Sequence, residues 1–301
     1  MHANRPDRLI PAIAFRLVSV VAFATMGALI KFAEVRGAKL VELLFFRQAL
    51  AIPVVFAAVI AGPGLQTLKT GRLSAHVLRT VIGLSSMSCM FLTIMLLPLA
   101  EATTLQFTVP IFATILGALV LREPTGWHRW GAVIMGFFGV VIVAQPGSGH
   151  IPLIGALTGL SAALLSATVS ILLRHIGKTE RATTTVFYFS LLSLVPLAPL
   201  FVMTAQPHDA WTWMLLVLIG LAGGIGQIAM TSSLALAPVA VVVPMDYSGL
   251  IWATLYGYLL FGALPTPMTW AGAPIIIASG LYIVWREHRR SQTNTITAVS
   301  Q

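Results

Sequence analysis

The chain has 301 residues, of which 57% are hydrophobic and only 9% are charged, and its mean hydropathy is +0.92. A soluble domain carries about 25% charged residues, and a globule of this length could not hide so much apolar surface. The composition excludes an ordinary cytosolic enzyme, a disordered chain and a fibrous repeat. The net charge of +9 needs a separate explanation, which the positions of the basic residues provide.

Apolar stretches long enough to cross a bilayer follow one another along the whole chain. A spanning helix needs roughly 20 mostly apolar residues. Ten such stretches are predicted, at residues 10–32, 41–61, 76–96, 99–121, 127–144, 152–173, 183–203, 211–236, 238–262 and 268–286. Very short breaks at Pro98 and Pro238 predict helical hairpins. The first stretch has no small-residue cleavage site, so we expect it to remain as the first helix.

Basic residues are distributed unequally between the two ends of these stretches. With a cytoplasmic N-terminus, the cytoplasmic segments hold 12 of the 18 lysines and arginines, and the opposite side holds only Lys31, Arg36 and Lys39. Arg16, Arg47 and Arg79 stay inside or at the edges of spans. This asymmetry predicts a multi-pass membrane protein with both termini cytoplasmic and an even number of helices. The positive charge therefore indicates orientation, and we expect no nucleic-acid partner, since no basic cluster has interleaved aromatics.

Short similarities between the two halves indicate a duplicated chain. Gly83-Leu84 recurs as Gly220-Leu221, and residues 97–102 resemble residues 234–239, both at an offset of 137; Trp130 and Trp270 correspond at 140. The predicted divisions are an N-terminal segment (1–9), a first five-helix repeat (10–146), a second (147–286) and a disordered cytoplasmic tail (287–301). Five helices is an odd number, so the second copy enters the membrane inverted, as in secondary transporters.

This layout resembles the EamA branch of the drug/metabolite transporter superfamily. The motifs that carry the resemblance are Glu42-Leu43-Leu44-Phe45-Phe46-Arg47, Leu78-Arg79, Leu97-Pro98-Leu99-Ala100-Glu101-Ala102, Pro110, Arg122-Glu123-Pro124, the run from Pro244 to Ala253, and Leu260-Phe261-Gly262. The resemblance extends over residues 10 to 286. Family members usually have a Glu where this chain has Ala263.

The resemblance implies an all-α integral membrane protein with ten transmembrane helices around a central cavity. It also implies export or uptake of small metabolites, such as amino acids, nucleosides and vitamins, by a protein of the bacterial inner membrane. Helices 2 and 9 look closest to bacterial members that transport S-adenosylmethionine, riboflavin or metallophores.

Asp246 is the clearest candidate for a functional residue, because a charge in the bilayer costs at least about 2.5–3.5 kcal/mol at a helix centre. It lies beside Pro244, whose missing N–H leaves the carbonyl of Ala240 without a helical partner. A weakened helix next to a carboxylate suits a cation or proton site. The alternative is an ion pair with a nearby arginine that holds helices together.

Other spans contribute polar candidates. Gln106 lies one turn before Pro110. It either binds substrate or forms a hydrogen bond with a neighbouring helix. Gln227 lies beside Gly223, Gly224 and Gly226, which favour close helix packing. Arg47 either binds a substrate carboxylate or phosphate or pairs with Glu42 or Glu101, and we favour the pair. We expect Arg79 to extend to the lipid headgroups.

Aromatic residues at depth complete the candidate site. Tyr188, Tyr247, Trp252 and Tyr256 either stack on a planar ligand or pack against helices and lipid. The candidate substrate-binding residues are Arg47, Gln106, Tyr188, Gln227, Asp246, Tyr247 and Trp252, and Asp246 is the candidate for proton coupling. The histidines and the single Cys89 lack metal-ligand spacing, so neither a metal nor a cofactor is predicted.

The predicted function is a secondary transporter that moves a small polar or zwitterionic metabolite by alternating access, by proton coupling or by exchange. The expected partners are this metabolite and membrane lipid, and the protein is a monomer or homodimer. No Gly-x-x-x-x-Gly-Lys loop for nucleotide is present. An intramembrane enzyme and a non-transporting structural protein are the alternatives. The first would need a catalytic constellation that the sequence lacks, and the second leaves Asp246 and Arg47 unexplained.

Overall fold

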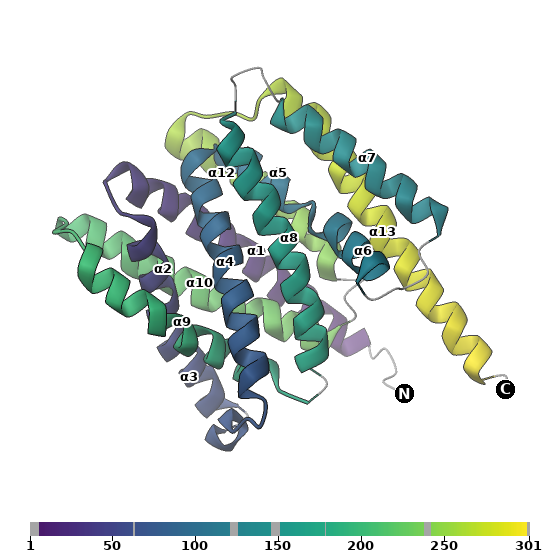
Figure 1. Ribbon diagram of the computed structural model, residues 1–301, viewed down its shortest axis with the longest axis horizontal. Helices are drawn as coiled ribbons and strands as arrows, with labels where there is room; N and C mark the ends of the chain where they lie inside the picture. The colour runs from purple at the N-terminus through teal and green to yellow at the C-terminus, as the bar shows by residue number, and fades with distance from the viewer. Residues whose placement is uncertain are drawn as a thin grey trace.

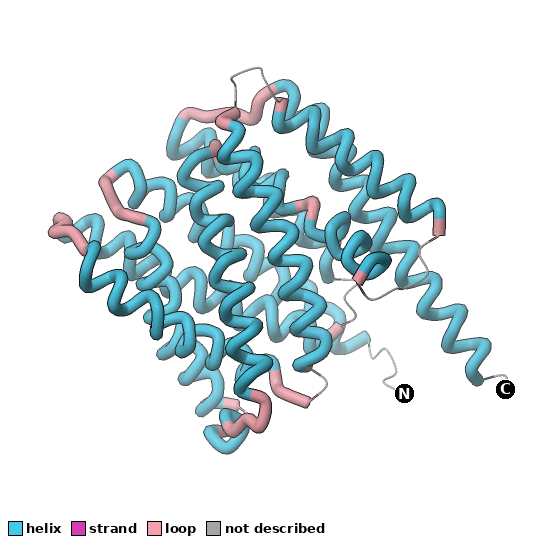
Figure 2. Tube along the Cα trace, viewed as in Figure 1, coloured by secondary structure: helices cyan, strands magenta, loops and turns pink. Residues whose placement is uncertain are grey.

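The computed structural model describes residues 6–62, 64–120, 126–145, 151–177, 179–237 and 242–299. Within these ranges the chain is helical apart from short connections, and no strand occurs (Figures 1 and 2). The elements are α1 (Pro6–Val35), α2 (Leu40–Ala49), α3 (Ala51–Ala61), η1 (Leu65–Leu68), α4 (Leu73–Leu96), α5 (Leu99–Gln106), α6 (Val109–Leu119), α7 (Trp127–Ala144), α8 (Leu153–Ile176), α9 (Ala182–Thr204), α10 (Ala210–Leu236), η2 (Val243–Ser248), α12 (Gly249–Phe261) and α13 (Pro267–Val299).

In the described part of the chain, nine segments are long and apolar enough to cross a membrane. They correspond to nine of the ten predicted spans. The remaining span, 238–262, is not one continuous helix over the described residues 242–262. It contains a six-residue 3₁₀ segment, η2, followed by the 13-residue α12. Pro244 lies in the first turn of η2, where its missing N–H removes no helical hydrogen bond. Ala240, whose carbonyl was expected to be freed, lies outside the described residues.

The predicted span 99–121 is also divided. Helix α5 ends at Gln106, and α6 begins at Val109 with Pro110 in its first turn. Proline is favoured at this position of a helix because its ring presets the backbone angle. The amides of Phe107 and Thr108 bond to Thr104 and Leu105 at three-residue spacing. The break between α5 and α6 is therefore a tight turn that keeps the two helices in one span.

Three helix pairs make the most extensive contacts: α1 with α10, α4 with α8, and α7 with α13 (Figure 1). Glycines allow the closest approaches. A Cβ on Gly220 of α10 would lie 2.5 Å from the Phe46 carbonyl oxygen of α2, and a Cβ on Gly272 of α13 would lie 2.7 Å from the Gly139 carbonyl oxygen of α7. Small residues at helix crossings are how membrane helices gain van der Waals contact.

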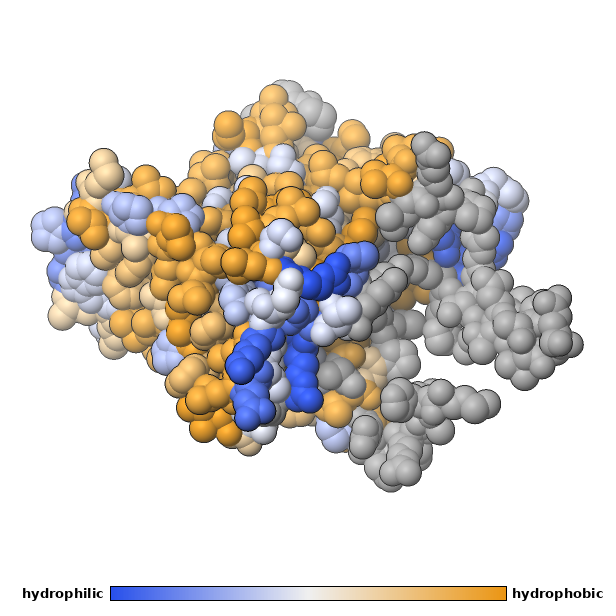
Figure 3. All heavy atoms as spheres, turned by 60° about the horizontal axis from the view of Figure 1, so that its bottom comes forward, coloured by the Kyte–Doolittle hydropathy of each residue, from blue (hydrophilic) through white to orange (hydrophobic). Residues whose placement is uncertain are grey.

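The outer surface is largely apolar, as a lipid-facing surface should be. Figure 3 views the end of the molecule that carries the α3–α4 and α8–α9 connections, where a group of hydrophilic residues near the centre of the view lies among hydrophobic ones. Hydrogen bonds join these two connections: Arg72 Nη1 donates to Thr179 Oγ1 at 2.9 Å, and Thr70 Oγ1 donates to Glu180 Oε1 at 2.7 Å.

Helix α13 continues to Val299. The sequence predicts a disordered tail from residue 287, and the structure differs there. The stretch just after Arg286 contains Glu, Arg and Gln, which are good helix formers, so the last spanning helix extends beyond its apolar part.

A charged pair at one end of the bundle gives a pH-dependent test of stability. Asp209 caps α10, and its carboxylate accepts hydrogen bonds from Thr212 and from Arg36 of the α1–α2 connection, the latter at 2.7 Å. The Thr212 hydroxyl, then Arg36, lower the pKa of the Asp209 carboxyl to about 2. Because this pKa is depressed, the stabilisation is present above the ordinary value of 3.8 and is lost as pH falls towards 2.

We expect Asp209→Asn to lower the thermal-unfolding midpoint of purified protein slightly at neutral pH. Asparagine keeps the helix cap, so the difference measures the exposed ionic contact with Arg36, which is weak. The gap between variant and wild type should narrow as pH falls from 3.8 towards 2. A gap independent of pH would contradict this assignment.

Candidate functional site

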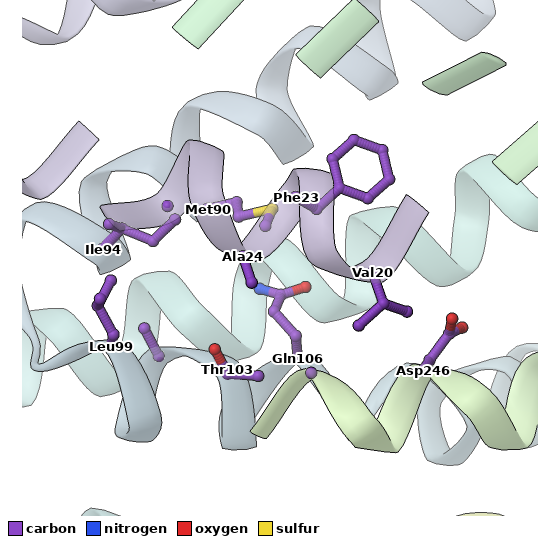
Figure 4. A pocket seen from close by; sticks show the side chains of 12 residues that line it. Val20, Phe23, Ala24, Met90, Ile94, Leu99, Thr103, Gln106 and Asp246 are labelled. Atoms are coloured by element: carbon purple, nitrogen blue, oxygen red, sulfur yellow. The ribbon is translucent and has the colours of Figure 1, made fainter. Parts of the chain in front are cut away.

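A small cavity of about 170 Å³ lies between α1, α4, α5, η2 and α12. Apolar side chains form most of its wall. Its polar side chains are Thr103, Gln106 and Asp246. Figure 4 shows Gln106 and Asp246 on neighbouring elements, both directed towards α1. Ligand pockets commonly have volumes of about 300–1,000 Å³, so a metabolite larger than a few heavy atoms fits only if the surrounding helices move.

Asp246 forms an ion pair with Arg16 of α1. The Arg16 guanidinium donates from both Nε and Nη2 to the two carboxylate oxygens. The Arg16 side chain is only 8% exposed, whereas that of Asp246 is 38% exposed and borders the cavity. Two parallel bonds make this the strong, directional form of an arginine–carboxylate pair. The sequence interpretation left a structural arginine partner open, and this contact shows which arginine it is.

Gln106 contributes an unused hydrogen-bond donor to the cavity. Its amide nitrogen is buried and has no hydrogen-bond partner. A buried, unsatisfied donor costs roughly 1–3 kcal/mol. The site thus contains a polar group that is not needed to hold two helices together, and it is available to a ligand.

Tyr247 lies next to this cavity and points away from it. Its ring contacts Phe107 edge-on, with ring centroids 4.9 Å apart. Its hydroxyl is buried without a hydrogen-bond partner, close to Gly280 of α13. Phe107 and Tyr247 therefore join the α5–α6 break to η2 at the point where both spans depart from regular α-helix.

A second group of predicted residues lies between α2 and α10. Arg47 Nη2 donates to Gln227 Oε1 at 3.4 Å, and Arg47 Nη1 donates to Gln48 Oε1 at 3.2 Å. The expected pairing of Arg47 with Glu42 or Glu101 is wrong. Glu42 is taken by the backbone of Lys39 and Gln206 and by the His208 ring, and Glu101 by Thr266 and Thr269.

The remaining predicted aromatics are dispersed. Tyr188 of α9 stacks on His76 of α4, with centroids 4.8 Å apart, and donates to the Leu68 carbonyl at 3.0 Å. Trp252 lies 6.3 Å from the Tyr256 ring. Neither Tyr188 nor Trp252 lines the cavity of Gln106 and Asp246. The structure thus brings Gln106 and Asp246 together in one place, and Arg47 and Gln227 in another.

Arg16 and Arg79 were not among the candidate site residues predicted from the sequence. Both are basic residues inside or at the edges of predicted spans, and this position is the sequence signal that could have identified them. Arg79 does not extend to the lipid headgroups as expected. It is 6% exposed, and its guanidinium carbon lies 3.8 Å from the centroid of the Phe189 ring. Within the described residues, no group of three or more His, Cys, Asp or Glu side chains is arranged to hold a metal ion.

Fold and cavity together define a multi-pass helical membrane protein with a small, mostly apolar cavity that contains a few polar side chains. Residues 10–145 and 153–285 each match the model of the EamA-like transporter family. The chain therefore belongs to this family, as the motifs in its sequence predict.

Individual relatives are transporters. The chain is 28% identical to a riboflavin transporter of Vibrio cholerae over 92% of this chain and 93% of that protein. It is 26% identical to an S-adenosylmethionine uptake transporter of Rickettsia felis over 81% of each. A solved crystal structure shares the fold, with a TM-score of 0.61 at 18% identity over 90% of this chain and 96% of that one.

Proposed function

We propose that this protein is a secondary transporter of the bacterial inner membrane that moves a small polar or zwitterionic metabolite by alternating access. Amino-acid-like, nucleoside-like and vitamin-like compounds are the substrate class. The observation that carries the proposal is the cavity in which Gln106 and Asp246 meet. A transporter also fits the family and the functions of the relatives.

The proposal includes ten membrane spans arranged as two inverted five-helix repeats. Gln106 and Asp246 are 140 residues apart, and so are Val109 and Gly249, the first residues of α6 and α12. These helix boundaries favour 140 over the offset of 137 suggested by sequence similarity in this stretch. Gln106 and Asp246 would thus be equivalent positions of the two copies, brought to one cavity.

The helix pairing supports the same repeat. If α1 corresponds to α8 and α4 to α10, the extensive α1–α10 and α4–α8 contacts are equivalent. Phe107 and Tyr247 are also 140 residues apart, and their rings touch. Equivalent residues that touch lie on the axis relating two copies. A cavity beside that axis is where transporters with inverted repeats hold substrate.

Asp246 is proposed to couple a proton to this exchange. Its carboxylate borders the cavity, so a proton entering there can reach it. Protonation removes the charge that holds Arg16, and α1 then loses its ionic contact with η2. Substrate and proton would then both change the contact between α1 and η2. Coupling requires that both ligands act on the same conformational equilibrium.

The test is flux into proteoliposomes containing the purified protein. A thermal-shift screen of polar metabolites, with riboflavin and S-adenosylmethionine included, selects compounds for labelled-substrate exchange. We expect saturable exchange that needs the protein and no ATP. If compounds that stabilise the protein show no exchange above empty liposomes, transport is the wrong function.

Gln106→Leu provides the specific prediction. The substitution removes a buried donor that has no partner, so we expect an unfolding midpoint equal to or above that of wild type. If Gln106 bonds to substrate, losing about 1.4 kcal/mol or more lowers flux at least tenfold.

Thr168→Ala is the matched control for Gln106→Leu. Thr168 is exposed on α8, and its hydroxyl bonds only within its own helix, to the Leu164 carbonyl. Its flux should equal that of wild type. Unchanged flux in Gln106→Leu would remove Gln106 from the substrate site.

A further inference from the structure

Two buried arginines lie on the neighbouring helices α2 and α4, and neither lines the cavity of Gln106 and Asp246. Arg47 comes from α2 and is 3% exposed, and Arg79 comes from α4 and is 6% exposed. Helices α2 and α4 pack against each other, and both pack against α9. Helices α9 and α10 complete the surroundings, through Phe189 and Gln227 respectively.

Neither arginine has a counter-charge among the described residues. No carboxylate there forms an ion pair with Arg47 or Arg79. Nε of Arg47, and both Nε and Nη1 of Arg79, are buried without any hydrogen-bond partner. The two bonds that Arg47 does make, at 3.2 and 3.4 Å, go to neutral amides and are long for a charged donor.

Glycines leave room for both guanidinium groups. A Cβ on Gly83 of α4 would lie 2.1 Å from Arg79 Nη1, and a Cβ on Gly223 of α10 would lie 2.4 Å from Arg47 Nε. Each arginine is thus directed across a helix surface that has no side chain at that point. Ser190 of α9, one residue beyond Phe189, has a buried hydroxyl that also lacks a partner.

This arrangement is costly for an empty protein. Burying an unpaired cation is expensive, and a second cation nearby adds repulsion. The surroundings supply a cation–π contact from Phe189 and two amide oxygens, which do not neutralise two charges. A single anion held between the two guanidinium groups would offset both costs and use the free N–H donors.

We propose that Arg47 and Arg79 bind an anionic group, a carboxylate or a phosphate, of a molecule that enters between α2, α4, α9 and α10. The planar guanidinium presents paired N–H donors that match both anions. The inference rests on the proposed transport function, and it identifies the substrate as one that carries a negative group. Gln227 orients Arg47, and Phe189 orients Arg79.

The experiment measures anion binding without flux. The thermal-unfolding midpoint of the purified full chain is followed against sodium phosphate and sodium malonate, at an ionic strength kept constant with sodium chloride. We expect a saturable rise for at least one of the two anions. Arg47→Met and Arg79→Met should each weaken that binding at least tenfold, while both variants stay as stable as wild type without anion, because each removes an unpaired buried charge.

Arg36→Met is the matched control, because Arg36 loses the same charge at an exposed site where it pairs with Asp209. It should bind the anion as wild type does. An equal rise in Arg47→Met and Arg79→Met, or no rise with either anion in wild type, overturns the proposal. Anion binding without exchange in proteoliposomes would instead refute the transport function and leave this site standing.

Discussion

Asp246→Asn is expected to abolish the pH dependence of substrate flux and to lower the flux itself at least tenfold. Asparagine has the shape of aspartate and carries no charge that a proton can neutralise. If Asp246 couples protons, flux in this variant becomes the same at every pH. The measurement is labelled-substrate exchange in proteoliposomes over a series of pH values, with the substrate selected by the thermal-shift screen.

Asp246→Asn also leaves Arg16 without its counter-ion, so a loss of stability must be separated from a loss of coupling. Breaking a buried pair by removing one partner costs about 3–5 kcal/mol. The exposure of the Asp246 side chain, 38%, places the expected loss at or below the low end of that range.

The double variant Arg16→Met with Asp246→Asn removes both charges. It should recover much of the stability and none of the pH dependence. If pH-dependent flux returns in the double variant, Asp246 is a structural partner of Arg16 and does not carry the proton.

The second large effect is expected at the crossing of α7 and α13. A Cβ on Gly139 would lie 3.0 Å from the Gly272 carbonyl oxygen, and a Cβ on Gly272 would lie 2.7 Å from the Gly139 carbonyl oxygen. Both contacts are to backbone, which cannot rotate away. Gly272→Leu must therefore separate the two helices, and overpacking of this kind costs about 1–3 kcal/mol.

We expect Gly272→Leu to lower the unfolding midpoint of the purified protein by several degrees and to reduce its yield in the membrane. Gly131→Leu is the control on the same helix pair, because a Cβ on Gly131 of α7 meets no atom within 4 Å. Its midpoint should match that of wild type. If both variants melt alike, backbone contact at this crossing does not limit stability.

Sequence reasoning predicts the class of fold well, because apolar runs of about 20 residues have one common outcome in a bilayer. It fails where side-chain direction decides. Arg47 and Glu42 are five residues apart on one predicted helix, so a pair was plausible, but Glu42 accepts bonds at the end of its helix while Arg47 extends towards α10. A helical period alone does not reveal which neighbour a long side chain reaches.

Part of the candidate site can be predicted from the sequence, but the partners of its residues cannot. Charge inside a span is costly, which identified Asp246 and Arg47 without any structure. Their partners come from helices far along the chain: Arg16 is 230 residues from Asp246, and Gln227 is 180 residues from Arg47. Pro244 likewise signalled an irregular ninth span, yet the 3₁₀ form of η2 depends on packing that the sequence does not display.

The 3₁₀ form of η2 also has a consequence for length. A 3₁₀ helix rises about 2.0 Å per residue and an α-helix about 1.5 Å. The six residues of η2 are thus about 3 Å longer than they would be as α-helix. Asp246 is the fourth residue of η2, so rewinding the segment as α-helix would move it by about 1–1.5 Å relative to the segment's ends. The pitch of η2 therefore sets the position of the carboxylate that holds Arg16 of α1.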